Sequence, residues 1–161
     1  MVLGKLNRLD LLSDLFAEVT IPQAVYDEVV VRGAARGSVE ALVVRMFWRA
    51  HGWPITAVPE KLRAAYTPSV VLGSGETEVL VLAQSYGDAL VLLDDEAARA
   101  EARRLRLQVC GTLGVLVRAH RRGLLTLPQA EMLIGEIAVR PDIWIAARLC
   151  EQVLASLREP R

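Results

Sequence analysis

Apolar side chains recur along this chain at spacings that predict helices separated by short strands. The first helical pattern covers about residues 9–16, and Pro22 is well placed to open a second helix. Residues 32–38, rich in glycine and small side chains, are predicted to form a loop. The remaining helices are expected at 39–49, from 75 or 76 onward, from Asp94–Glu96 to about 105, at 112–122, from Pro128 onward, and at 145–157.

The predicted strands are short apolar runs placed between these helices. The run ALVLL at 89–93 is bounded by polar residues on both sides, which is typical of a strand covered on both faces. Residues 18–21, 53–58 and 107–110 are the other candidates, and Pro54 favours an edge position for its strand. Strands therefore alternate with helices, a pattern that predicts an α/β fold with a parallel sheet.

Composition narrows the class of protein without naming an activity. The chain has 161 residues, of which 53% are hydrophobic, so it is long enough for one domain with a substantial core. A net charge of zero argues against a strongly basic protein that coats nucleic acid. Cys110 and Cys150 lack the spacing of a zinc site and are expected to be buried free thiols. With no signal peptide or membrane-spanning run visible, we expect a cytoplasmic protein.

Acidic side chains gather where the predicted strands end. Asp94 and Asp95 follow the strand 89–93, Glu76 and Glu78 lie in the first turn of the preceding helix, and Glu28 follows another strand. Clustered carboxylates repel one another unless they hold a cation, and oxygen ligands favour Mg²⁺ or Mn²⁺. Taken singly, each acid also fits a plainer role as a helix cap, a first-turn acid or a solvated side chain.

Five segments in series resemble PIN domains, the fold of many metal-dependent ribonucleases and of toxin nucleases in bacterial toxin–antitoxin pairs. They are LNRLDLLSDLF, EVTIPQAVYDEVV, GSGETEVLVLA, ALVLLDDEAAR and VCGTLGVLVRAHRRGLL, in family order. The resemblance implies one PIN-like domain over 1–161, a three-layer α/β fold with a central parallel sheet flanked by helices. It also implies a Mg²⁺- or Mn²⁺-dependent endoribonuclease, with RNA as substrate and a small antitoxin-like partner.

The resemblance assigns the site residues. The second family acid matches Glu28, the third matches Glu76 with Glu78 as a substitute, and the fourth matches Asp94 with Asp95 close behind. Glu28, Glu76 and Asp94 are thereby expected to be catalytic, and these three with Asp95 to bind the metal. The chain departs from the family at its start, because the first strand and its Asp are missing and Asp10 lies on the following helix.

Three explanations of this departure remain open: a start upstream of Met1, a truncation whose sheet is completed by a partner or by rearrangement, and a degenerate, non-catalytic member. With one ligand lost, we expect weak or absent nuclease activity. The alternative function is a non-catalytic PIN-fold protein that binds a protein partner or nucleic acid. Arg118, Arg121 and Arg122 are candidates for nucleic-acid contact, and apolar late helices suggest a homodimer.

Overall fold

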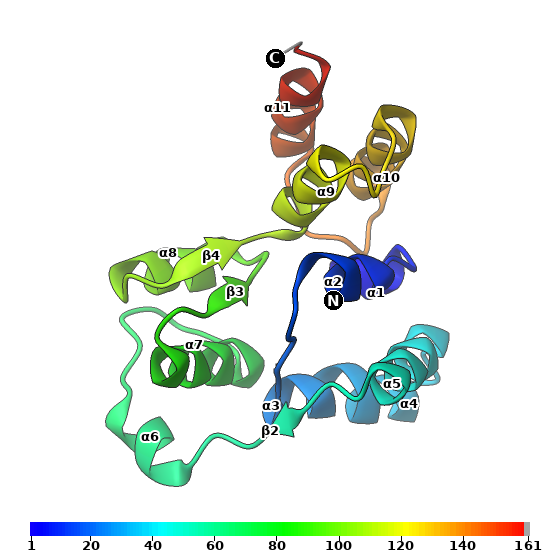
Figure 1. Ribbon diagram of the computed structural model, residues 1–161. Coiled ribbons are helices and arrows are strands. Elements are labelled where there is room, and N and C mark those ends of the chain that lie inside the picture. Colours follow the sequence, from blue (N-terminus) through cyan, green and yellow to red (C-terminus); the bar gives the residue numbers. More distant parts are fainter. Residues whose placement is uncertain (160–161) are drawn as a thin grey trace.

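The computed structural model describes residues 1–159, and its amino-terminal half carries two short strands among helices (Figure 1). The labels and bounds in this half, in which η1 is a π-helical turn, are α1 (Val2–Lys5), α2 (Asp10–Leu15), β1 (Ile21–Pro22), α3 (Gln23–Tyr26), η1 (Asp27–Val31), α4 (Arg32–Ala35), α5 (Val39–His51), β2 (Ile55–Thr56) and α6 (Glu60–Ala65). The carboxyl-terminal half contains α7 (Ser74–Tyr86), β3 (Leu90–Leu92), α8 (Glu96–Arg104), β4 (Gln108–Cys110), α9 (Thr112–Arg121), α10 (Leu127–Val139) and α11 (Ala147–Arg158).

The strands are parallel, as the alternation of strands and helices predicts, but they form two separate pairs. Ile21 of β1 lies opposite Ile55 of β2, and Leu90 of β3 lies opposite Gln108 of β4. No pairing joins β1 to β3 in the described part of the chain. The expected central sheet is thus present as two halves, each of two strands connected by helices.

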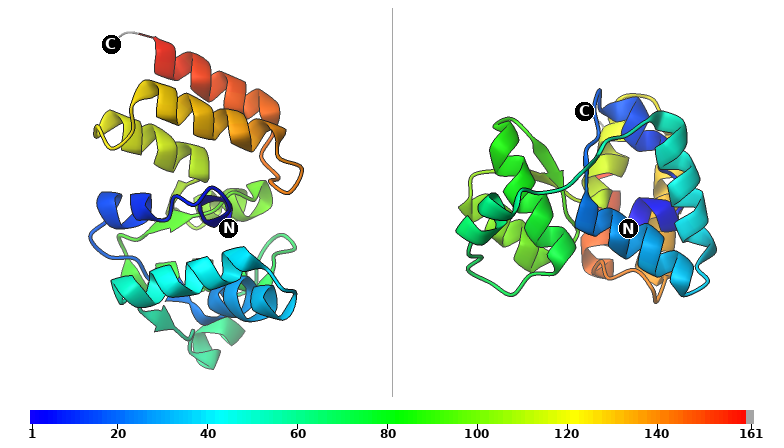
Figure 2. Two further views of the ribbon diagram at one scale, coloured as in Figure 1. Left: turned by 90° about the vertical axis from the view of Figure 1, so that its right-hand side faces the viewer. Right: turned by 90° about the horizontal axis from the view of Figure 1, so that it is seen from below.

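Two hydrophobic clusters hold these halves in place. The larger one joins α1, α2 and α5 with α9, α10 and α11, and its fully buried members include Leu11, Leu116 and Ile134. The smaller one packs Leu80 of α7 and Ala98 of α8 against β3. Figures 1 and 2 show α9, α10 and α11 as one layer, with α1 and α2 between this layer and α5. Each pair of strands therefore packs against helices.

Several sequence predictions need correction at the level of single elements. The loop expected at 32–38 contains the helical turn α4, where Gly33 allows a close approach to Ala41 of α5: a Cβ added at Gly33 would lie 2.8 Å from the Ala41 Cβ. Tertiary packing here outweighs the low helix propensity of glycine. The helix α1 was not expected, and the strand expected at 18–21 is reduced to Ile21–Pro22.

Both cysteines are buried free thiols, as expected, and burial raises the pKa of each. Desolvation is the largest cause of both shifts, because burial disfavours the charged thiolate. Within residues 1–159, no helix has the length and apolar character needed to cross a membrane.

Candidate metal and nucleic-acid site

Asp94 lies just past the carboxyl end of β3 and connects that strand to the start of α9. Its Oδ1 accepts a hydrogen bond from the Thr112 backbone N–H, and its Oδ2 accepts one from the Thr112 hydroxyl, both at 2.7 Å. The carboxylate therefore sits at the positive end of the α9 dipole. The helix predicted at 112–122 begins at Thr112, and Gly111 occupies its cap position.

Gly111 and Arg99 complete the immediate surroundings of Asp94. A Cβ added at Gly111 would lie 3.1 Å from Asp94 Oδ1 and 3.2 Å from Arg99 Nη1. The guanidinium of Arg99 therefore lies beside Gly111 and Asp94, and its Nε is buried with no hydrogen-bond partner among the described residues. Arg99 brings a positive charge, which suits contact with a phosphate group, to the end of β3 where only acids were expected.

Glu28 lies on η1, in the chain segment that follows β1, and its carboxylate is exposed. A Cβ added at Gly75 would lie 3.2 Å from Glu28 Oε2, so this carboxylate sits beside the first turn of α7. Residues 1–159 provide no hydrogen bond to it, which leaves both oxygens free for a ligand.

The other three predicted acids are held by the backbone of nearby residues. Glu76 Oε2 accepts a hydrogen bond from the Gly73 N–H at 2.8 Å, and Asp95 Oδ1 accepts one from the Ala98 N–H at 2.8 Å. Each carboxylate thus caps a helix start. Glu78 is buried, accepts a 2.8 Å hydrogen bond from a backbone N–H at the start of α3, and lies 3.4 Å from an Arg63 nitrogen. For Glu76 and Asp95 these contacts correspond to the plainer roles that the sequence left open, whereas Glu78 holds the start of α3 through a contact that the sequence did not predict.

The amino group of Met1 lies close enough to Glu28 and Asp94 for both charges to act on it. Burial lowers the pKa of this amino group, while the two carboxylates oppose the shift by favouring the charged form. The same end of the molecule therefore collects Glu28, Asp94 and the first turn of α7, from three separate segments of the chain.

The residues as placed do not fit a tight Mg²⁺ site. No group of three or more His, Cys, Asp or Glu side chains in the described part of the chain is arranged to hold a metal ion. Mg²⁺ demands near-octahedral oxygen coordination, and it binds weakly where few carboxylates contribute. Among the five predicted acids, Glu28 alone accepts no hydrogen bond from residues 1–159, because Asp94 is engaged by Thr112 and Glu76 by Gly73.

The three candidate nucleic-acid residues, Arg118, Arg121 and Arg122, are exposed at the carboxyl end of α9. Asp94 contacts the opposite end of that helix, through Thr112. The helix rises by 1.5 Å per residue, so Arg121 lies roughly 14 Å along its axis from Thr112. The arginines and the acids consequently occupy different ends of α9, and Arg99 is the nearer cation.

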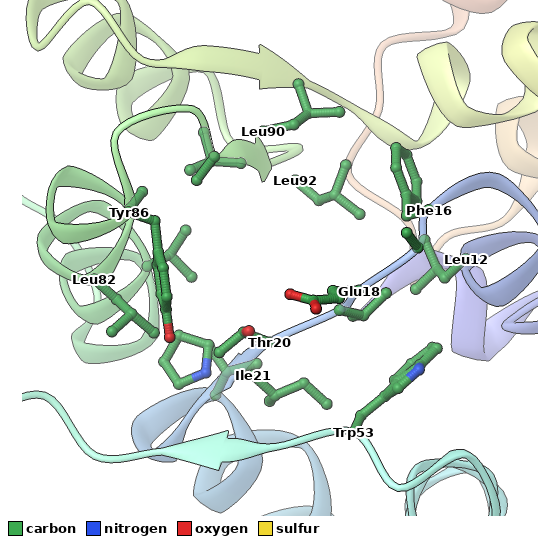
Figure 3. A pocket seen from close by; sticks show the side chains of 18 of the residues that line it. Leu12, Phe16, Glu18, Thr20, Ile21, Trp53, Leu82, Tyr86, Leu90 and Leu92 are labelled. Atoms are coloured by element: carbon green, nitrogen blue, oxygen red, sulfur yellow. The ribbon is translucent and has the colours of Figure 1, made fainter.

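A groove separates the two halves of the sheet (Figure 3). It has a volume of about 630 Å³ and is lined by β1, β3, α7 and residues from α2 to β1. In Figure 3, Leu82 and Tyr86 of α7 face Leu12, Phe16 and Trp53 across the groove. Mostly apolar side chains line it, so the groove is a second candidate site of a different chemical kind.

Arg99 and Thr112 were not predicted as site residues, although the position of each relative to a strand end indicates that it lies near Asp94. Arg99 is in the first turn of the helix after Asp94, and Thr112 follows the glycine that ends the next strand. In adjacent parallel strands such positions meet at the same edge of the sheet.

The comparisons with known proteins address the chain as a whole. The model of family DUF3368, described as a PIN domain, matches residues 1–159. Neither a curated protein nor a solved structure matches. The family match covers nearly the full chain and agrees with the parallel strands, the flanking helices and the acids that follow β3. This chain belongs to the DUF3368 family of PIN domains.

Proposed function

We propose that this protein is a PIN domain of the metal-dependent endoribonuclease type, related to toxin nucleases, and that the chain by itself cleaves RNA weakly or not at all. RNA is the substrate class, and Mg²⁺ or Mn²⁺ is the ion that Glu28 and Asp94 would hold. One observation carries the proposal: Asp94 at the end of β3 and Glu28 beside the first turn of α7 present carboxylates from separate segments, whereas Glu76 and Asp95 cap helix starts and Glu78 is held by Ala24 and Arg63.

The test is a Mn²⁺ titration of the purified chain, read by calorimetry and by cleavage of a fluorophore-quencher RNA. We expect the unsubstituted chain to bind Mn²⁺ weakly and the Asp94→Asn variant to bind it more weakly still. We expect the two proteins to cleave the RNA at the same low rate. Asp95→Asn is the matched control, because Asp95 caps α8 and does not contact Thr112. Robust Mn²⁺-dependent cleavage that Asp94→Asn abolishes would contradict the weak activity. Mn²⁺ binding unaffected by Asp94→Asn would contradict the ligand assignment.

A second candidate function is a non-catalytic PIN-fold protein that binds a protein partner. The groove between β1 and β3 favours it, because a large apolar surface at an open sheet edge is suited to protein contact. A small antitoxin-like protein and a second copy of the chain are the partners that we consider. The molecular mass of the purified protein in solution at micromolar concentration distinguishes the two: a dimer mass indicates a second copy, and a monomer mass leaves the groove open to a different protein.

A further inference from the structure

Arg99 of α8 is a cation without a carboxylate partner in the described part of the chain. The other two arginines of this helix are both paired. Arg103 lies 2.9 Å from a Glu96 oxygen. Arg104 lies 2.8 Å from a Glu101 oxygen. The guanidinium of Arg99 forms no salt bridge or hydrogen bond with residues 1–159, and its Nε is buried. The donors of this guanidinium are therefore unused.

The carboxylate of Asp94 lies beside this guanidinium without pairing with it. Both oxygens of Asp94 accept hydrogen bonds from Thr112, one from the N–H and one from the hydroxyl, so the negative charge is engaged at the start of α9. No salt bridge joins Asp94 to Arg99 in residues 1–159. The positive charge of Arg99 consequently remains open to a ligand that approaches the end of β3.

Gly111 leaves the space beside which the guanidinium lies. A Cβ added at this glycine would be 3.2 Å from Arg99 Nη1, 3.1 Å from Asp94 Oδ1 and 3.3 Å from the Leu93 carbonyl oxygen. The backbone of Gly111 is ordinary extended backbone, with φ −102° and ψ 174°. The glycine therefore provides space and not an unusual conformation, and a side chain in its place would press on both the guanidinium and the carboxylate.

A phosphodiester group fits this arrangement of charges and donors. A guanidinium presents its N–H groups in a planar fork that matches two phosphate oxygens. A phosphate that approaches the end of β3 also meets the negative charge of Asp94, and a cation beside that carboxylate offsets the repulsion. Arg99 therefore allows a polyanion such as RNA to lie against an acidic side chain.

We propose that Arg99 binds an internal phosphodiester group of the RNA strand and holds it beside Asp94 at the end of β3. The contact is to the RNA backbone, so it is independent of base sequence. The inference rests on the proposed function, because it takes RNA as the ligand, but the contact requires no metal ion and is measured without one. It places the contact at the end of β3, whereas the arginines suggested by the sequence lie at the carboxyl end of α9.

The experiment measures affinity for single-stranded RNA in the presence of EDTA, by fluorescence anisotropy at several salt concentrations. The probe has about ten nucleotides, a 5′-hydroxyl end and a fluorescein at its 3′ end, so internal phosphates supply the contacts. For Arg99→Gln we expect about tenfold weaker binding. The plot of log affinity against log salt should be shallower by about 0.7, the value for one lost phosphate contact in a single strand. Arg99→Lys keeps the charge without the fork, so its slope should match the wild type while its affinity falls about threefold.

Arg45→Gln is the matched control for the loss of charge. Arg45 is an exposed arginine of α5 that has no carboxylate partner among the described residues, and α5 packs against η1, α4 and α1. The substitution removes the same charge from a different element of the fold. It should therefore weaken RNA binding by less than about twofold, through the general electrostatic attraction alone.

Gly111→Ala gives a second test that leaves the net charge unchanged. Its Cβ would press on the guanidinium of Arg99, so we expect RNA binding to weaken by about threefold or more. Gly135→Ala, in α10, is the control, because a Cβ there has nothing within 4 Å, and it should leave the affinity unchanged. Thermal melts of all variants show whether the fold is retained.

Oligomers of uridine, adenosine and cytidine distinguish a phosphate contact from a base contact. Arg99→Gln should weaken the binding of all three to the same degree, and a loss confined to one of them would overturn the proposal. Equal weakening by Arg99→Gln and Arg45→Gln would also overturn it, because a general charge effect would then be sufficient. Wild-type binding that Arg99→Gln leaves unchanged would overturn this inference alone, whereas a wild type that binds no RNA would contradict the proposed function as well.

Discussion

Two glutamates show how differently this fold uses a carboxylate. Glu101 of α8 is 1% exposed and accepts hydrogen bonds from the Tyr66 hydroxyl, from the backbone and side chain of Ser69, and from Arg104. Glu28 of η1 is exposed and receives no hydrogen bond within residues 1–159. The first carboxylate fixes the chain before α7 onto α8, whereas the second has its full capacity for a ligand.

The electrostatics of the Glu101 cluster follow from these contacts. The Arg104 guanidinium, followed by the Ser69 hydroxyl, holds the pKa of Glu101 far below its usual range. Burial, helped by the hydrogen bond to Glu101, raises the pKa of Tyr66 to about 12. A charged carboxylate surrounded by donors stabilises the fold and is unavailable to a metal. Glu101, enclosed by donors, therefore has a structural role, whereas Glu28, which accepts no hydrogen bond from the described residues, is open to a ligand.

The largest effect is expected from Glu101→Gln. The substitution leaves Ser69 and Arg104 facing a neutral, partly donating amide, so we expect the free energy of unfolding to fall by about 2–4 kcal/mol. Urea denaturation followed by circular dichroism measures it. Glu96→Gln is the matched control, because Glu96 pairs with Arg103 at the surface of the same helix, where water screens the pair, and the substitution should leave stability nearly unchanged. Equal losses of stability in Glu101→Gln and Glu96→Gln would show that the buried carboxylate contributes no more to the fold than the exposed one.

The pH dependence of stability in the wild type and in Glu101→Gln gives a second test of the role of Glu101. The pKa of Glu101 is lower in the folded than in the unfolded protein, so the unfolded state binds more protons below the ordinary glutamate pKa of about 4.3. The stabilisation by Glu101 is therefore complete above that pH and is lost as the pH falls toward the folded-state pKa. The stability difference between wild type and Glu101→Gln should accordingly shrink below about pH 4. A difference that stays constant down to pH 2.5 would contradict this assignment.

A smaller loss of stability is expected from Asp94→Ala. It removes two hydrogen bonds at the start of α9, and losing such a cap costs about 1 kcal/mol. Asp95→Ala removes the cap of α8 and should cost a similar amount. The two variants should differ only in Mn²⁺ binding, measured by calorimetry, which Asp94→Ala weakens and Asp95→Ala does not. Equal Mn²⁺ binding by both variants would show that Asp94 serves only as a cap.

Apart from the short helical segments α1 and α4, the order of strands and helices was predictable from the sequence, because the longer elements carry their own periodicity. The helix after 89–93 begins with Asp95 as its cap, and the parallel pairing follows from the alternation of elements. The helical turn α4 was missed, because Gly33 has a low helix propensity and the close packing of this turn against Ala41 cannot be read from the local sequence. Local patterns thus predict elements well and tertiary exceptions poorly.

The candidate site was less predictable than the fold for the same reason. The positions of the five acids are read from the chain, but their hydrogen-bond partners are not: the Ala24 N–H that holds Glu78 is 54 residues away. The proximity of Arg99 to Asp94 likewise depends on how α8 and β4 pack. An acid at a strand end is therefore a candidate from sequence, and its partners decide which role it has.

The smallest effect on stability is expected from Glu28→Gln, and it tests the comparison at its other end. Since the carboxylate of Glu28 is exposed and accepts no hydrogen bond from the described residues, the substitution should change the free energy of unfolding by no more than about 0.5 kcal/mol. The charge is nevertheless beside Gly75 and near the Met1 amino group, so Mn²⁺ affinity should fall. Asp27→Asn, at the neighbouring acid that accepts a hydrogen bond from Gln23, is the control and should leave Mn²⁺ binding unchanged. A stability loss above about 1 kcal/mol with unchanged Mn²⁺ affinity would show that Glu28 has a structural role, as Glu101 does.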